Sequence, residues 1–395
     1  MKQLKVENFG PIRNAEVTWG DLTILIGPQA SGKSLFLELF KLIVDRRHIM
    51  RTLQKYNYIL SKSNTRLLLD DYFGEGLSTI FTKDTNIEWD KKPFGLKDLL
   101  VANGALRSGQ EERESVFYIP AQRILSIADG RPKNFMEFDI STPYVLRIFS
   151  ETLRVFIQGG LGNPETIFPI RNRLKDVMKK TIDETIFHGG QVVIDQSSSQ
   201  RKMKLQVGRM RLPFMTWSAG QKEFMPLLLA IYCLSGPPTA VIDKENFKWV
   251  IIEEPEMGLH PRAIEAVILE IMELMQLGYK VIVSTHSPVL LEFAWAFRTI
   301  SQSHGNIKKA MCELFGIADN SSTATLFDGI GEKEFNAFYF SSSGSKGKEG
   351  VHSSDISSLD VTDENVNIAE WGGLSAFAGK ASEIVSKYYR ENSEL

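Results

Sequence analysis

A glycine-rich turn near the start of the 395-residue chain restricts the possible fold more than any other feature. The turn follows a continuously apolar run at 22–26, typical of a strand buried on both faces, and precedes an amphipathic helical pattern over 33–47. Its residues are Gly27, Pro28, Gln29, Ala30, Ser31, Gly32, Lys33 and Ser34. The spacing G-x-x-x-x-G-K-S between a strand and a helix is typical of a loop whose backbone N–H groups cradle phosphates. We therefore expect an α/β fold in which Lys33 reaches the β and γ phosphates of ATP and Ser34 holds Mg²⁺.

A second apolar run, at 249–252, ends in adjacent carboxylates. Glu253 and Glu254 follow it directly, and Glu256 comes two residues later. One acid at the end of such a strand can complete a Mg²⁺ shell, and the next can polarise an attacking water as general base. We assign Glu253 to the metal and Glu254 to the water. The alternative is a charged strand end that merely faces solvent.

Three weaker signals accompany these two. The sequence WSAGQKE opens an apolar helix, so free N–H groups near Ser218, Gly220 and Gln221 can bind an anion, although an N-cap serine with nothing bound is an equal alternative. His286 follows the apolar strand 279–285, where α/β sheets bind ligands, although a buried histidine would give the same pattern. Gln122, in YIPAQR, can contact Mg²⁺ or the lytic water, or can be a surface glutamine.

Composition excludes several classes of protein. The net charge of −2 leaves no overall attraction for nucleic acid or an anionic membrane. The two cysteines, Cys233 and Cys312, form no CxxC pair, which excludes a zinc ribbon and a disulfide scaffold and favours a cytoplasmic location. The longest apolar run, 224–234, is about half the roughly 20 residues that a spanning helix needs, so we expect no membrane contact.

Two basic segments, 171–180 and 201–211, allow a local contact with nucleic acid. Their cations are Arg171, Arg173, Lys175, Lys179, Lys180, Arg201, Lys202, Lys204, Arg209 and Arg211. A solvated face, or a docking surface for an acidic protein, is the commoner explanation of such a pattern.

The chain divides into a core and three additions. We place the core at 1–47, 116–125 and 205–300, where the strand and turn patterns lie. Residues 48–115 form an insertion, 130–204 form a helical and β insertion that serves as an arm or docks a partner, and 301–395 form a C-terminal extension. The Ser- and Gly-rich stretch 341–354 is predicted to be a mobile loop.

The order of these signals resembles the ABC-class ATPases, in particular the soluble branch of OLD-, RecF- and SMC-like proteins. The similar segments are LKVENFGPIRNAEVTWGDLTILIGPQASGKS, IIEEPEMGLHP and VSTHSPVLLEF, with AEWGGL at 369–374. The resemblance implies an ABC-type ATPase head, a mixed sheet with flanking helices. Trp217, Ala219 and Glu253 depart from the residues usual at their positions, which are Leu, Gly and Asp.

The resemblance also implies a homodimer, or a higher homo-oligomer, that sandwiches two ATP molecules. Ser218 and Gly220 of one subunit would complete the site around Lys33 of the other, and residues 258–260 would cross the interface. Glu254 would be the catalytic base and His286 the sensor of the γ phosphate. ATP would then hold the subunits together, and hydrolysis would release them.

The OLD proteins add a Toprim nuclease domain, which needs a D-x-D cluster on an apolar strand, and no such cluster follows the histidine strand here. The first hypothesis is therefore a switch subunit that controls a separately encoded nuclease or toxin, similar to the ATPases of the PARIS, Septu and retron-linked phage-defence systems. The second is a RecF-like DNA-repair ATPase that clamps DNA. A transporter's nucleotide-binding subunit is a remote third, disfavoured by the long segments 48–115 and 130–210.

Overall fold

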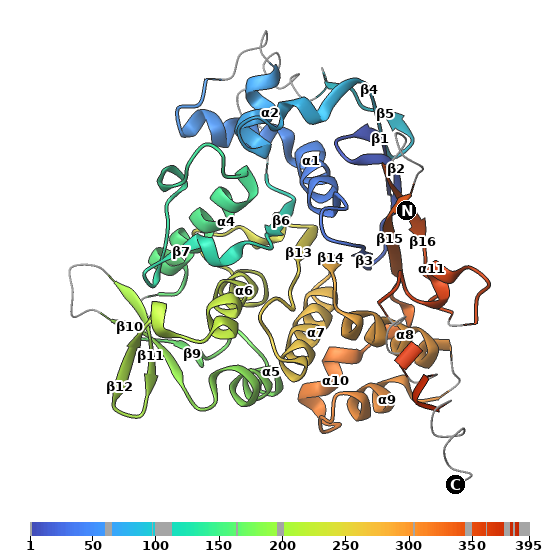
Figure 1. Ribbon diagram of the computed structural model, residues 1–395. Coiled ribbons are helices and arrows are strands. Elements are labelled where there is room, and N and C mark those ends of the chain that lie inside the picture. Colours follow the sequence, from blue (N-terminus) through green and yellow to red (C-terminus); the bar gives the residue numbers. More distant parts are fainter. Residues whose placement is uncertain are drawn as a thin grey trace.

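A ten-stranded mixed sheet runs through the protein (Figure 1). The computed structural model describes residues 2–59, 65–96, 98, 113–162, 165–195, 201–302, 305–343, 350–360, 362–374, 380–381 and 384–386. The strand order is β5-β4-β1-β2-β16-β15-β3-β14-β13-β6. Bounds are β1 Gln3–Phe9, β2 Ile12–Thr18, β3 Leu22–Ile26, β4 Phe81–Trp89, β5 Lys92–Pro93, β6 Val116–Ile119, β13 Trp249–Glu253, β14 Lys280–Thr285, β15 Phe335–Ser343 and β16 Gly350–Asp355. The predicted α/β class, a mixed sheet with flanking helices, is confirmed.

The parallel half of this sheet carries the predicted motifs. β15, β3, β14, β13 and β6 run parallel to one another as neighbours. Every residue of β3, β6 and β13 is buried, as expected for parallel strands covered by helices on both faces. Their carboxyl ends therefore meet at one edge of the sheet.

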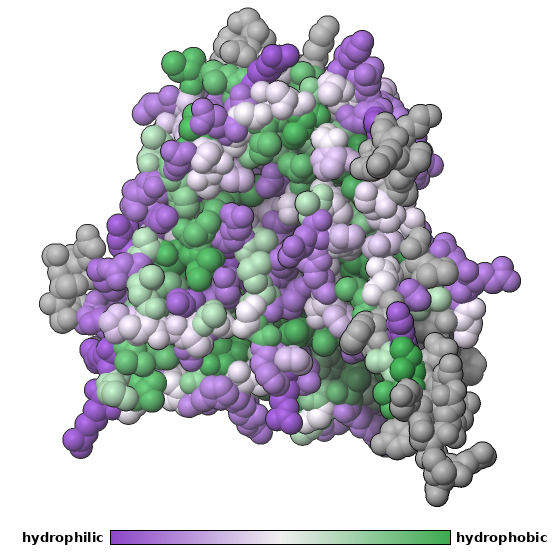
Figure 2. Space-filling model, in the orientation of Figure 1, coloured by the Kyte–Doolittle hydropathy of each residue, from purple (hydrophilic) through white to green (hydrophobic). Residues whose placement is uncertain are grey.

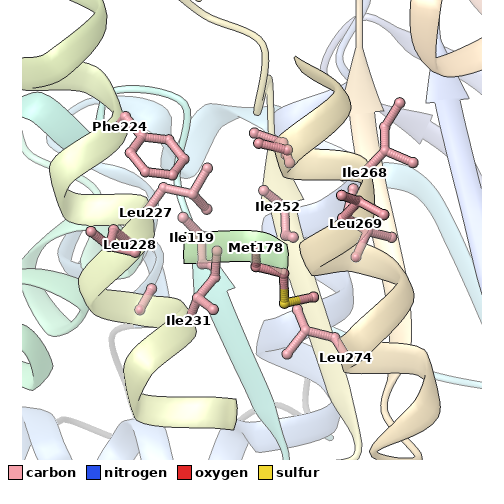
Figure 3. Packing of buried hydrophobic residues seen from close by; sticks show 14 of the residues in the cluster. Ile119, Met178, Phe224, Leu227, Leu228, Ile231, Ile252, Ile268, Leu269 and Leu274 are labelled. Atoms are coloured by element: carbon pink, nitrogen blue, oxygen red, sulfur yellow. The ribbon is translucent and has the colours of Figure 1, made fainter. Parts of the chain in front are cut away.

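Helices pack on both faces of the sheet. Their bounds are α1 Lys33–Lys55, α2 Thr65–Phe73, α4 Tyr144–Val155, α5 Asp176–Ile182, α6 Ala219–Ser235, α7 Pro261–Gln276, α8 Pro288–Gln302, α9 Ile307–Leu314, α10 Ser321–Phe327 and α11 Val366–Ala369. Successive side chains of a strand face opposite sides of the sheet, so the protein has two hydrophobic cores, one on each face. Ile252 lies in the core with α6, α7 and α8, while its neighbour Ile251 lies in the core with α1 and α2. Figure 3 shows Phe224, Leu227 and Ile231 of α6 facing α7 across this first core.

The C-terminal segment completes the centre of the sheet. β15 pairs with β3, and β16 pairs with both β15 and β2, so the predicted extension joins the two halves of the sheet. The prediction of a mobile loop at 341–354 is wrong for 341–343 and 350–354, which lie in these strands, and 344–349 fall outside the described residues. Serine-rich composition suggested a loop, but pairing with β3 and β2 and the burial of Phe340 and Val351 impose strands.

Two other segment boundaries of the structure also differ from those predicted from the sequence. The predicted insertion 48–115 carries β4 and β5 of the main sheet. A second, four-stranded sheet consists of β9 Thr166–Phe168, β10 Gln191–Asp195, β11 Lys202–Val207 and β12 Met210–Pro213. β11 therefore crosses the predicted boundary at 204–205. No helix among the described residues has the length and apolar character needed to cross a bilayer. Hydrophilic and apolar side chains are interspersed on the face seen in Figure 2.

Candidate functional site

The phosphate loop links β3 to α1 at the carboxyl edge of the sheet. Gly27 has φ 149°, and a Cβ there would lie 2.3 Å from the carbonyl oxygen of Phe340 on β15, so only glycine fits. Ala30 and Gly32 also have positive φ, at 59° and 80°, which curls the loop in front of the helix. Gln29, Ala30 and Ser34 are exposed and Ser31 is buried, so the outer face of the loop is open to a ligand.

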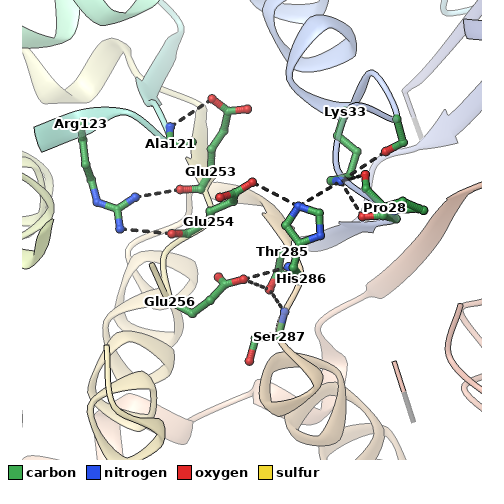
Figure 4. A network of polar contacts seen from close by, with 12 residues as sticks. Pro28, Lys33, Ala121, Arg123, Glu253, Glu254, Glu256, Thr285, His286 and Ser287 are labelled. Atoms are coloured by element: carbon green, nitrogen blue, oxygen red, sulfur yellow. Dashed lines mark hydrogen bonds and ion pairs between the residues drawn. The ribbon is translucent and has the colours of Figure 1, made fainter. Parts of the chain in front are cut away.

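Lys33 lies under this loop rather than in solvent. Its Nζ donates to the carbonyl oxygens of Gly27 at 2.7 Å and Pro28 at 3.0 Å (Figure 4). Burial lowers the pKa of Lys33 to about 8, although Glu254 and Glu253 oppose the shift. A phosphate that replaced these carbonyls would favour the charged ammonium.

Glu253 ends β13 beside the loop and is buried. Its Oε2 accepts the N–H of Ala121 at 3.3 Å, while its Oε1 is buried without a hydrogen-bond partner. Burial raises the pKa of Glu253, and the hydroxyl of Ser34 and the N–H of Ala121 oppose the shift. An unpartnered carboxylate oxygen beside a serine hydroxyl suits a hard cation, so Glu253 and Ser34 fit Mg²⁺. No group of three or more His, Cys, Asp or Glu side chains within the described ranges forms a metal site.

Glu254 and His286 form a chain of contacts with Lys33. His286 Nε2 lies 3.2 Å from Glu254 Oε1 and 3.4 Å from Lys33 Nζ. Figure 4 shows the histidine between the other two side chains. Glu254 has φ 42°, a left-handed backbone that turns its side chain away from the strand, and its N–H donates to Ser284 at 2.8 Å. Side chains of Glu254 and His286 remain 27% and 30% exposed, so water reaches the carboxylate.

Two residues of the site had no role in the sequence prediction. Arg123, fully buried, donates to the carbonyl oxygens of Glu253 at 2.9 Å and Glu254 at 3.1 Å. Glu256 Oε1 accepts the hydroxyl of Thr285 at 2.6 Å and the N–H of His286 at 2.8 Å. Arg123 directly follows Gln122 and Glu256 lies two residues after Glu254, so a charged residue close to a predicted site residue is the signal that could have identified them.

Gln122 follows β6 at the same edge. It is exposed and precedes the 3₁₀ turn Arg123–Ser126. β6 pairs with β13, so Gln122 lies near the end of the acidic strand, and the N–H of its neighbour Ala121 contacts Glu253. The structure thus places Lys33, Glu253, Glu254, His286 and Gln122 on adjacent strand ends.

The predicted anion-binding cap begins α6. Ser218 Oγ accepts the N–H of Gln221, and Gln221 Oε1 accepts the N–H of Ser218, both at 3.2 Å. This reciprocal pair is a capping box. Gln221 Nε2 also donates to the carbonyl oxygen of Ile186 at 3.0 Å, so both ends of its amide are hydrogen-bonded within the protomer. Ser218 is exposed, and over the described ranges no hydrogen bond or ion pair joins it to the phosphate loop of its own chain.

Gly220 packs the start of α6 against the loop that follows the acids. A Cβ at Gly220 would lie 2.7 Å from the carbonyl oxygen of Gly258, which itself has φ 72°. His260 caps α7 by accepting the N–H of Arg262 at 3.3 Å. The exposed residues Ser218, Gly258 and His260 therefore belong to adjoining segments.

Most cations of the two basic segments are engaged inside the chain. Arg173 is buried and donates to the carbonyls of Tyr232 and Gly160, both at 2.9 Å. The ion pairs are Lys175–Glu273, Lys179–Asp176, Lys180–Glu184, Lys202–Asp129 and Lys204–Asp195. These pairs reduce the positive charge that 171–180 and 201–211 can offer to a phosphate backbone.

Similarities to known proteins fall on the segments that build this site. Residues 1–127 match the family described as AAA ATPase domain, and 207–292 match AAA domain, putative AbiEii toxin, Type IV TA system. The Old nuclease of Escherichia phage P2 is 28% identical over 132 residues, which are 33% of this chain and 21% of the nuclease. The match thus spans about a fifth of that relative's length.

Two solved structures are among those that align with this chain. The SmcHead bound to the C-winged helix domain of ScpA aligns with TM-score 0.38 and 11% identity, covering 89% of this chain and 97% of that one. The dimeric structure of MJ0796, a bacterial ABC transporter cassette, aligns with TM-score 0.32 and 12% identity over 73% and 90% of the two chains.

The first matched family segment contains the phosphate loop and Gln122, and the second contains the Ser218 cap, the acidic strand and His286. Strand pairing brings the two segments together, because β3 of the first segment lies beside β14 of the second. Residues 1–127 and 207–292 are therefore each similar to an AAA-type ATPase domain, and a stretch of 132 residues is similar to the Old nuclease.

Proposed function

We propose that the protein is a switch subunit that dimerises around ATP, hydrolyses it with Mg²⁺, and thereby controls a separately encoded nuclease or toxin in prokaryotic antiviral defence. The observation that carries the proposal is the contact chain Lys33–His286–Glu254. It joins a phosphate loop to a water-accessible carboxylate through a histidine, which is the set of groups that phosphoryl transfer to water needs.

Each side chain has a distinct task in the proposed reaction. Lys33 leaves the carbonyls of Gly27 and Pro28 and pairs with the β and γ phosphates. Glu254 then accepts a proton from the attacking water, and His286 lies within reach of the γ phosphate. Gln122, at the end of β6, orients the same water or the metal shell. Magnesium, held by Ser34 and Glu253, would neutralise developing phosphate charge.

The position of the Ser218 cap supports the proposed closure as a dimer. The cap is exposed and contacts no part of the phosphate loop in its own chain within the described ranges. The partial positive charge at this helix N-terminus favours an anion, and a partner's ATP can supply one. ATP shifts the population toward the dimer only if it contacts both halves, which this arrangement allows.

The test combines two substitutions with a mass measurement. Lys33→Ala should abolish ATP binding and leave a monomer at all ATP concentrations. Glu254→Gln should bind ATP, fail to hydrolyse it and accumulate as a dimer, measured by light scattering with and without ATP. A Glu254→Gln protein that hydrolyses ATP at the normal rate contradicts the assignment of the base.

The effector is proposed from the resemblance to defence ATPases and from the names of the matched toxin family and the Old nuclease. Co-expression with the product of the adjacent gene, followed by affinity purification, tests it. We expect a stable complex whose nuclease or toxin activity changes with ATP, and no complex under any nucleotide condition contradicts the proposal.

A RecF-like DNA clamp is the second candidate, favoured by the basic segments. Because most of their cations are paired within the chain, we rank it below the switch. ATP-dependent, salt-sensitive binding of duplex DNA by the purified protein would reverse that order.

A further inference from the structure

Arg123 lies fully buried at the meeting point of three elements. Its Nε donates to the carbonyl oxygen of Glu223 on α6 at 3.0 Å. Nη1 donates to the carbonyl of Glu253 at 2.9 Å, and Nη2 donates to that of Glu254 at 3.1 Å. One guanidinium therefore joins the turn after β6, the first turns of α6 and the end of β13 (Figure 4 shows the last contact).

The acceptors of Arg123 are all backbone atoms of the proposed machinery. Glu223 lies five residues after the Ser218 cap, and Glu254 is the proposed base. The left-handed backbone of Glu254 is unfavourable for a residue with a Cβ, so it needs such external support. The contact between Gly220 and Gly258 brings the same two segments together a second time.

Because Arg123 connects α6 to the backbone of Glu254, an event at one ATP site of the dimer can affect the other site. In the proposed sandwich, the Ser218 cap of one copy closes on the ATP of its partner, whereas Glu254 acts on the ATP of its own copy. Any movement of α6 that follows closure on the partner's ATP reaches Glu254 through the carbonyls that Arg123 holds. The forked guanidinium suits this task, because it presents several donors in fixed directions.

We infer that Arg123 is a positioning residue that couples the two ATP sites of the dimer, by fixing the backbone of Glu254 to the helix that carries the Ser218 cap. The inference rests on the proposed function. Arg123 contacts neither the nucleotide nor the attacking water in this arrangement.

Arg123→Lys tests the coupling, because lysine keeps the charge but lacks the forked guanidinium, whose three nitrogens each donate to a different carbonyl. Arg173→Lys is the matched control: Arg173 is also buried and also donates to two backbone carbonyls, those of Tyr232 and Gly160, away from the site. For each variant we would measure binding of a fluorescent ATP analogue, the ATP-driven dimer mass, kcat, KM and the Hill coefficient of hydrolysis.

Arg123→Lys should bind the analogue within about twofold of the wild type, lose about tenfold or more in kcat, and show a Hill coefficient that falls to 1. Arg173→Lys should keep the wild-type kcat and Hill coefficient. The inference is overturned if Arg123→Lys retains cooperative hydrolysis, if Arg173→Lys behaves identically to it, or if the wild-type dimer itself hydrolyses ATP without cooperativity. A wild-type chain that neither binds ATP nor dimerises contradicts the proposed function itself.

Hydrogen exchange of the Glu254→Gln protein provides a second test that does not depend on the folding of an Arg123 variant. ATP should protect the peptides that contain 218–223 and 253–258 over the same range of ATP concentration. Protection of the two segments with clearly different midpoints overturns the coupling.

Discussion

Lys33 should make ATP binding depend on pH above neutrality. Its pKa in the free protein is lowered to about 8, because burial removes the ammonium from water. Bound phosphates favour the charged form and raise this pKa, so ATP binding takes up a proton wherever the free lysine is deprotonated. Affinity is therefore full below pH 8 and falls as the pH rises through 8.

The magnitude follows from the protonated fraction of Lys33 in the free protein. With a pKa of about 8, raising the pH from 7 to 9 lowers that fraction about tenfold, so the Kd for ATP should rise about tenfold. At pH 8 about half a proton per site should be taken up on binding. Phosphate groups titrate near pH 6, so the ligand itself contributes little in this range.

Calorimetric titrations of the Glu254→Gln protein, which does not consume ATP, measure both quantities. Repeating them in buffers with different ionisation enthalpies gives the proton uptake directly. Lys33→Arg is the control, because a guanidinium stays charged throughout and should give a weaker but pH-independent affinity. An affinity of the Lys33 protein that stays constant from pH 7 to 9.5, or an equal slope in Lys33→Arg, refutes the reasoning.

Substitutions at three positions separate the tasks of the site residues. Glu254→Gln should lower kcat by about 10²–10⁴-fold with ATP affinity retained, measured by phosphate release and analogue binding. Glu256→Gln should keep an oxygen acceptor for Thr285 and His286 and leave kcat within about threefold. Glu256→Ala removes that acceptor, so it should destabilise the fold by about 1–3 kcal/mol in urea titrations and lower kcat further. Equal effects of the two substitutions contradict the role of that oxygen. Ser218→Asp should preserve the helix cap, since aspartate is an equally good N-cap, but place a negative charge against the partner's triphosphate. It should bind the ATP analogue normally and fail to dimerise, and an ATP-driven dimer of normal affinity argues against the sandwich.

The parts of the site that were predictable from sequence are those set by local geometry. The phosphate loop, Glu253, Glu254 and His286 each follow an apolar strand directly, so the pattern alone places them at a carboxyl edge. Parallel pairing then brings them together, as the sequence order suggested.

Features that depend on distant pairing were not predictable. Arg123 contacts Glu223 and Glu253 only because α6 and β13 pack against the turn after β6. No periodicity in the sequence predicts that packing. The strands β15 and β16 carry serines and glycines that suggest a loop, because their neighbours β3 and β2 lie some 300 residues earlier. The basic segments looked available for nucleic acid because their acidic partners, such as Glu273 and Asp129, lie far away in sequence.

The position of β15 also determines the stage of synthesis at which β3 gains its second neighbouring strand. The carbonyl of Phe340 lies against Gly27, so the unit of β3, phosphate loop and α1 gains a neighbouring strand that is synthesised some 300 residues later. A nascent chain of 300 residues would contain the phosphate loop, the acidic strand and His286 but leave one edge of β3 unpaired, an edge that invites association with other chains. A truncation designed from the motifs alone would create the same defect, so we expect stable expression of the motif-bearing segments to require the chain through β16.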